Sequence, residues 1–229
     1  MAGRVVVVLD QRLGRNFKGG LMDLTFKSML EWVKLTIRNP RMASSLVKEA
    51  RLPLEVSIIL IVLAGVVSGI TFGIFSYAFE AMLANIELAE QQITPLSQNP
   101  LMEGVLSSLQ GIALAFAVHR IGAAMGGQGG LNDIMAVTAV IQLVAALIFL
   151  VVIVVFFIEP ILGGLLALFG GFVFLRGLGN AVNVGHDFNN MGKTVAVIVL
   201  SFLAVYIFIT VLGAVFGLGP DAVVAGETL

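Results

Sequence analysis

The sequence has no cysteine, two histidines and few charged residues, which make up 12% of its 229 residues. Without cysteine, disulfides, thiolate nucleophiles and cysteine-bound metals are excluded. The two histidines, His119 and His186, are too few for a histidine-rich metal site. Hydrophobic residues instead make up 59% of the chain, with a mean hydropathy of +1.04. A soluble core could not bury so much apolar surface, and the same composition excludes disorder.

Five stretches of the chain carry no charge, at residues 56–79, 104–118, 134–158, 160–175 and 194–220. A helix that crosses the hydrocarbon core needs about 20 apolar residues. The first, third and fifth stretches meet this outright, whereas the fourth does so only if its helix includes Arg176 and runs to about residue 184. Because lipid offers the backbone no hydrogen-bond partner, we predict an all-α polytopic membrane protein with five transmembrane helices. Spans three and four either cross fully or form a shallow re-entrant pair.

The chain divides into four expected segments. Residues 1–21 form an N-terminal extension of irregular pattern, and one interpretation places the natural start at Met22. Residues 22–53 form an amphipathic cytoplasmic segment, residues 54–220 the five-span membrane domain, and residues 221–229 a short exterior tail.

Lysine and arginine lie on one side of the predicted spans. Ten of the 13 precede the first span, and Arg120, Arg176 and Lys193 fall on that same side. The opposite side carries only acidic residues. Because basic loops are retained in the cytoplasm during insertion, we predict a multi-pass protein of the cell (plasma or inner) membrane, with a cytoplasmic N-terminus and an exterior C-terminus.

The segment that begins at Met22 has the period of an amphipathic helix, which should end at Asn39 because a proline follows. One interpretation places this helix in the headgroup layer. The other makes it a cap packed under the bundle, and the two are not exclusive. The residues that we expect at the membrane surface are Lys27, Trp32, Lys34, Arg38 and Arg41.

Repeated glycines indicate close helix packing, because small residues let two helix backbones approach each other. Such repeats occur in the first span at Gly65, Gly69 and Gly73, and in the fifth at Gly213 and Gly217. We interpret these faces as packing inside the bundle, with contact between copies as the alternative.

Two loops contain glycine motifs that could suggest phosphate binding, at residues 122–130 and 185–194. Neither follows a strand, so we expect neither nucleotide nor nucleic acid as a partner. We interpret both loops as flexible turns. Asn132 with Asp133, and Asn189 with Asn190, are expected to cap the helices that follow.

Few polar side chains interrupt the spans. Glu159 and Pro160 mark an obligatory turn, and Glu159 is either an interfacial carboxylate or a proton or cation contact inside the bundle. Gln142 should make an interhelical hydrogen bond, and Arg176 needs a partner if its span continues. With no catalytic constellation, metal site or cofactor motif, we expect no enzyme.

Four passages carry a family resemblance: an Asn-Pro element at residues 35–41, His119-Arg120-Ile121-Gly122 with the glycines and Asp133 that follow, the Pro160 turn, and Gly185-His186-Asp187-Phe188 leading to Ala196. In their order the chain resembles the Yip family, the Ypt/Rab-interacting membrane proteins, in its short prokaryotic form. The resemblance implies five spans and a cytoplasmic N-terminus. In eukaryotic members it also implies binding of prenylated Rab-type GTPases, but their Asp-Leu-Tyr-Gly-Pro element is replaced here by residues 51–55.

Two functions follow as hypotheses. The first is a non-enzymatic membrane scaffold or partner-binding protein that contacts membrane lipids and other membrane proteins or copies of itself. The alternative is a transporter of small solutes or ions, or a subunit of a membrane complex, with Glu159, Gln142 and Arg176 as its polar path.

Overall fold

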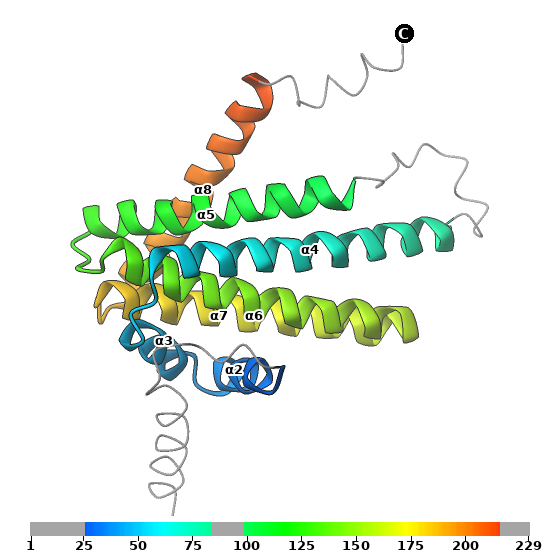
Figure 1. Ribbon diagram of the computed structural model, residues 1–229, viewed down its shortest axis with the longest axis horizontal. Coiled ribbons are helices and arrows are strands. Elements are labelled where there is room, and N and C mark those ends of the chain that lie inside the picture. The colour runs from blue at the N-terminus through cyan, green and yellow to red at the C-terminus, as the bar shows by residue number, and fades with distance from the viewer. Residues whose placement is uncertain (1–25, 84–98, 216–229) are drawn as a thin grey trace, which may run out of the picture.

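The computed structural model describes residues 26–83 and 99–215, and every regular element within them is a helix (Figure 1). The helices are α2 (Phe26–Arg38), α3 (Pro40–Glu49), α4 (Leu54–Leu83), α5 (Pro100–Ala124), α6 (Leu131–Ile158), α7 (Pro160–His186) and α8 (Met191–Val215). By length and composition, α4 to α8 can each cross a membrane, which confirms the predicted fold class. The predicted segments 1–21 and 221–229 lie outside the described residues.

Successive long helices run in opposite directions, so their ends gather in two groups (Figure 1). One end holds α3, the start of α4, the α5–α6 loop and the α7–α8 loop. Arg120 and Lys193 lie there, as do the basic residues of α3. We call this the basic end. Arg176 lies about 15 Å along α7 from it.

Helix α6 is the centre of the bundle. It packs against α4, α5 and α7, and also touches α2 and α3. Its residues from Ile134 to Ile141 are all buried. A helical segment that is apolar and buried on every side is a core element, so the first half of α6 forms the core against which the other helices pack.

The predicted glycine face of the first span lies against α5. A Cβ at Gly65 would overlap the Ser108 hydroxyl, and one at Gly69 would stand 2.6 Å from the backbone nitrogen of Gly104. Gly73 faces the ring of Pro100. The two backbones therefore touch where a larger side chain would hold them apart.

The second predicted glycine pair lies near the limit of the described chain. Gly213 is in the last turn of α8, where side-chain packing is not described, and Gly217 lies outside the described residues. Their packing role therefore stays a prediction.

The turn between α6 and α7 is a single extended residue. Glu159 has φ −149° and ψ 103°, and its Oε1 accepts the backbone N–H of Ile161 at 3.2 Å. Pro160 occupies the first turn of α7, where its missing N–H costs nothing. Because α6 has 28 residues and α7 has 27, each is about 40 Å long, which is enough for a full crossing.

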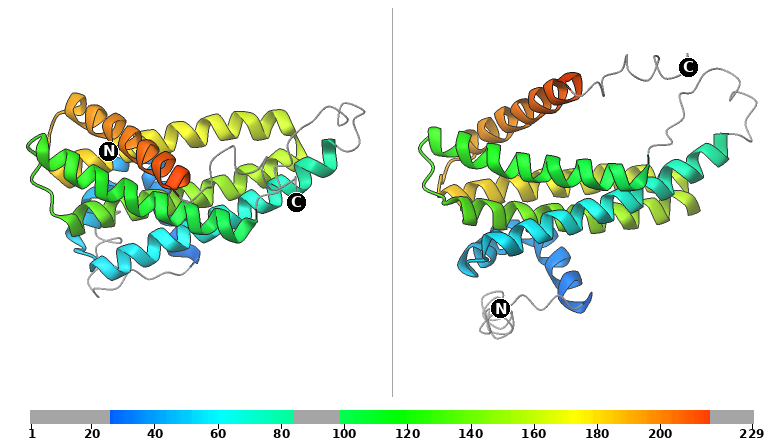
Figure 2. Two further views of the ribbon diagram at one scale, coloured as in Figure 1. Left: turned by 90° about the horizontal axis from the view of Figure 1, so that it is seen from above. Right: turned by 45° about the horizontal axis from the view of Figure 1, so that its top comes forward.

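Helix α8 joins the bundle at its first half only. It packs against α5 and α7, and its buried residues are Thr194, Val197 and Ser201. No residue from 202 to 211 is buried. The right-hand view shows the later part of α8 diverging from the other helices (Figure 2).

We predict that Gly69→Leu separates α4 from α5. The new side chain would meet backbone atoms of Pro100 and Gly104, which cannot move aside as a flexible side chain can. Overpacking of this kind costs about 1–3 kcal/mol. Thermal unfolding of the purified protein in detergent measures the loss.

The matched control is Gly164→Leu on α7, because a Cβ at Gly164 meets nothing within 4 Å. Equal stability of the two variants would contradict the close approach of α4 and α5.

Candidate functional site

The chain of α2 and α3 folds back onto α6 and α7 at the basic end. Helix α2 ends at Arg38, and Asn39 starts α3 by accepting the Met42 N–H on its Oδ1 at 3.1 Å. This agrees with the predicted stop at Asn39. The amphipathic segment thus packs on the bundle, as the cap interpretation expects, and the headgroup interpretation stays a prediction.

Trp32 corrects the expected surface set. Its side chain is only 8% exposed and belongs to the hydrophobic core, whereas an interfacial aromatic was expected. The reason is its position one turn before buried Thr36, on the face of α2 that packs on α6 and α7. Lys34, Arg38 and Arg41 are exposed, and the side chain of Lys27 lies outside the described part.

Two basic side chains hold this region to α7. Nη1 of Arg176 donates to the Ile37 carbonyl at 2.8 Å, so the partner that Arg176 requires is the last turn of α2. Lys48 on α3 donates to the carbonyls of Val184 and Gly185 at 3.0 and 3.3 Å. The same ammonium lies 2.6 Å from Oδ2 of Asp187.

These contacts satisfy the C-terminus of α7. Asp187 adopts φ 55°, a left-handed conformation that asparagine and aspartate tolerate better than most residues. The N–H of Phe188 reaches the Asn183 carbonyl at 3.1 Å, as in a Schellman motif. The Val184 carbonyl accepts the Asp187 N–H at 3.3 Å as well as the Lys48 ammonium, which also binds the Gly185 carbonyl. These carbonyls carry the partial negative charge of the helix end.

His186, at this same end of α7, fills a space inside the bundle. It is 1% exposed, and its Nε2 lies 3.1 Å from the Val118 carbonyl of α5. A carbonyl oxygen only accepts, so Nε2 donates this hydrogen bond. The ring stacks on Phe188 with centroids 5.0 Å apart and faces the ring of His119 at 6.4 Å.

Two glycines make room for this ring. A Cβ on Gly122 or on Gly127 would overlap the imidazole. The Gln128 N–H also donates to the His186 carbonyl at 3.0 Å. We call His119, Gly122, Gly127, His186 and Phe188 the histidine junction. It joins α5, α7 and their loops at the basic end.

The histidine junction corrects the expectation that the loop after span two is a flexible turn. Gly127 closes it with an N–H bond of 2.8 Å to the Gly122 carbonyl, and Gly129 lies against Gly185. The loop is thus a packed element whose glycines accommodate the end of α7.

The predicted helix caps are half right. Asn190 caps α8 by accepting the N–H groups of Gly192 and Lys193 on its Oδ1. Helix α6 instead starts at Gly130 without a side-chain cap, so Asn132 and Asp133 lie inside its first turn. Asn189 accepts a hydrogen bond from Arg41 at 3.4 Å.

The arrangement joins helices through hydrogen bonds and an ion pair. Asp187 is paired with Lys48, and no hydrogen bond joins it to the adjacent His186 side chain. Among residues 26–83 and 99–215, no group of three or more His, Cys, Asp and Glu side chains could hold a metal. Its hydrogen bonds and ion pair fix the N-terminal segment to the bundle.

The three residues of the expected polar path lie apart. Glu159 caps the start of α7, Arg176 lies about 25 Å further along that helix, and Gln142 lies in mid-span on α6. The Gln142 amide donates to the Gly111 carbonyl of α5 at 3.2 Å, so the expected interhelical hydrogen bond is present. No observation favours transport through these three groups.

The sequence did not lead us to predict the bonds of Lys48 to α7 or the buried position of His186. The sequence signal for the position of His186 was the pair of glycines after span two. Glycines leave space for a large side chain from another segment, and the His186 ring occupies that space. Lys48 gave no local signal, because its partners lie 136–139 residues away.

We predict that Gly122→Ala has opposite effects in two backgrounds. In the native chain the new methyl group meets the His186 ring and destabilises the fold by about 1–3 kcal/mol. In His186→Ala the clash is gone, and alanine stabilises the helix by up to about 1 kcal/mol over glycine. A double-mutant cycle of unfolding free energies measures this coupling.

Gly179→Ala is the control, because Gly179 lies inside helix α7 and its Cβ would meet nothing within 4 Å. Additive effects of Gly122→Ala and His186→Ala would show that the ring does not occupy this position.

A comparison with protein families gives a match over most of the chain. The Yip1 domain matches residues 34–212, which covers α3 to α7, the C-terminal part of α2, most of α8, and the histidine junction. No curated protein and no solved structure gives a significant match. Because the match covers well over half of the sequence, the chain belongs to the Yip1-domain family of multi-pass membrane proteins.

Proposed function

We propose that this protein is a non-enzymatic membrane scaffold that binds other membrane proteins, or copies of itself, through the surface of α2 and α3 at its basic end. Yip1-family proteins are generally non-enzymatic membrane proteins. The observation that carries the proposal is that α2 and α3 are fixed to the bundle, by Arg176 and by Lys48. A surface held in this way is ready to bind without first being ordered.

The outward side of α2 and α3 is charged, with basic residues in the majority. Its exposed charged side chains are Glu31, Lys34, Arg38, Arg41 and Glu49, and exposed Arg51 lies in the turn that follows α3. Exposed basic residues near a membrane are attracted to anionic headgroups by about 1 kcal/mol each. The same surface therefore supports contact with both lipid and the acidic surface of a protein partner.

We also propose that the basic end faces the cytoplasm of the cell (plasma or inner) membrane, which leaves the C-terminus outside. The gathering of lysine and arginine at that end supports this, since such residues are retained during insertion. In the membrane itself, the exposed apolar side of α4, with Ile59, Val66 and Ile70, offers a face for helix–helix contact.

Co-purification in mild detergent, after chemical crosslinking in native membranes, tests the proposal. We expect the full chain to be recovered in a discrete assembly. The double variant Lys34→Glu/Arg38→Glu should lower that recovery about tenfold, because two exposed positive charges become negative at the binding surface.

The double variant Glu31→Lys/Glu49→Lys is the control, because it reverses charges on the same two helices without removing a basic residue. Recovery of monomer alone, or equal recovery with both double variants, would contradict the proposal.

A further inference from the structure

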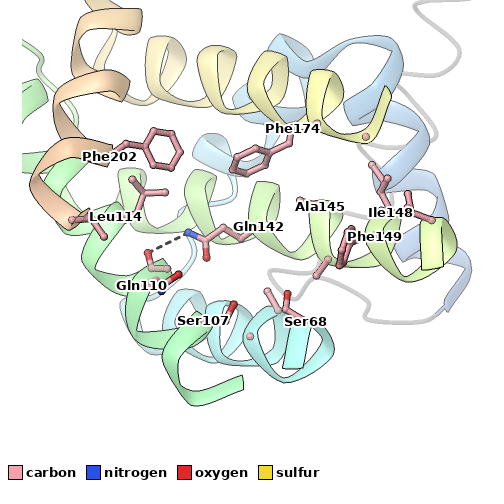
Figure 3. Close-up of a pocket in the computed structure, with 18 of the residues that line it drawn as sticks. Ser68, Ser107, Gln110, Leu114, Gln142, Ala145, Ile148, Phe149, Phe174 and Phe202 are labelled. Carbon is pink, nitrogen blue, oxygen red and sulfur yellow. Dashed lines mark hydrogen bonds between the residues drawn. The ribbon is translucent and has the colours of Figure 1, made fainter. Parts of the chain in front are cut away.

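An open cavity of about 640 Å³ lies between the spanning helices, bordered by all five long helices. It contains the side chain of Gln142, which points from α6 toward α5 (Figure 3). Gln142 lies about 17 Å from the start of α6, and Gln110 about 15 Å from the start of α5. We call this space the midspan cavity, since both residues are near the middle of their helices.

The cavity exists because the second half of α8 stands away from α7. Phe202, Val205 and Tyr206 of α8 form its outer wall. The side of α7 that faces α8 carries small residues at the cavity, among them Gly170 and Gly171. The two walls do not fill the space between them, and a hydrocarbon chain from the surrounding bilayer is the natural occupant at this depth.

The lining excludes some ligands. It contains no Asp, Glu, Lys, Arg or His, so nothing in it would compensate the charge of an ion. The aromatic rings of Phe174 and Phe202 line one side (Figure 3). Its volume falls within the range of sites that hold small organic molecules, about 300–1,000 Å³.

Polar side chains on the other side have no hydrogen-bond partner among the described residues. Elsewhere in the spans, Thr71, Ser76 and Ser108 each bond to the carbonyl four residues before, whereas the buried hydroxyls of Thr138 and Ser201 have no described partner. Ser68 and Ser107, which line the cavity, make no hydrogen bond with any described residue, and the same is true of Gln110. At hydrocarbon depth, an unpaired hydroxyl or amide is costly and favours a ligand that can pair with it.

We propose that the midspan cavity binds an uncharged single-chain amphiphile from the bilayer. Its hydroxyl or carbonyl group would bond to Gln110 and Ser107, while its apolar chain would lie against Phe174 and Phe202 and pass between α7 and α8. The Oε1 of Gln142 adds an acceptor, because the Gln142 amide donates to Gly111 through Nε2. The proposal does not depend on the partner surface of α2 and α3.

Photolabelling of the full chain in phosphatidylcholine vesicles tests it, with hexadecanol that carries a mid-chain diazirine as the probe. We expect labels on the cavity segments, α6 from 142 to 149 and α7 from 167 to 174, and competition by unlabelled hexadecanol. Gly171→Leu should lower this labelling about tenfold, since it places a side chain in the cavity where nothing lies within 4 Å of its Cβ.

Gly164→Leu is the matched control, because Gly164 is on the same helix, is equally open, and does not line the cavity. Gln110→Leu should lower labelling by hexadecanol about fivefold, the value of one net hydrogen bond. It should leave labelling by the diazirine form of hexadecane unchanged.

Three results would overturn the proposal. One is labelling confined to outward residues such as Ile70. Another is equal labelling of native protein and Gly171→Leu, as expected if α8 closes onto α7. The third is equal loss of both probes in Gln110→Leu, or loss of neither, since the polar groups would then not recognise the ligand.

Discussion

The hydrocarbon interior of a bilayer offers no hydrogen-bond partner to a peptide group, and the rest of this structure depends on that constraint. The apolar stretches must cross as helices. Some of their polar side chains bond within the protein, as Thr71 does to its own helix and Gln142 does to α5. Charged side chains lie mostly near the helix ends, and the basic ones other than Arg176 gather at a single end.

A second constraint acts at the basic end, where the last carbonyl groups of α7 have no partner within the helix. The left-handed Asp187 turns the chain, and Lys48 binds the carbonyls of Val184 and Gly185 from a helix far away in sequence. The neighbouring His186 fills the space above Gly122 and Gly127. Three of the four passages that carry the family resemblance therefore lie at the basic end, whereas the Pro160 turn lies at the opposite end.

The spans could be predicted because they depend on local composition, and the turn at Glu159 and Pro160 because two apolar runs cannot form one helix of twice the membrane thickness. The α4–α5 approach at Gly69 was also readable from a repeat within one helix. Trp32, Lys48 and the glycine loop were not, because their environments come from distant segments. The midspan cavity arises from the divergence of α8, and no pattern of residues in the sequence predicts that divergence.

The central claim is that the bundle crosses the membrane five times with its basic end in the cytoplasm. Because the chain has no cysteine, single-cysteine variants report one position each to a membrane-impermeant maleimide. The account predicts that Asn99→Cys reacts in intact cells, whereas Gln128→Cys and Lys193→Cys react only after permeabilisation. Reaction of Lys193→Cys in intact cells, or the same accessibility at Asn99 and Lys193, would contradict it.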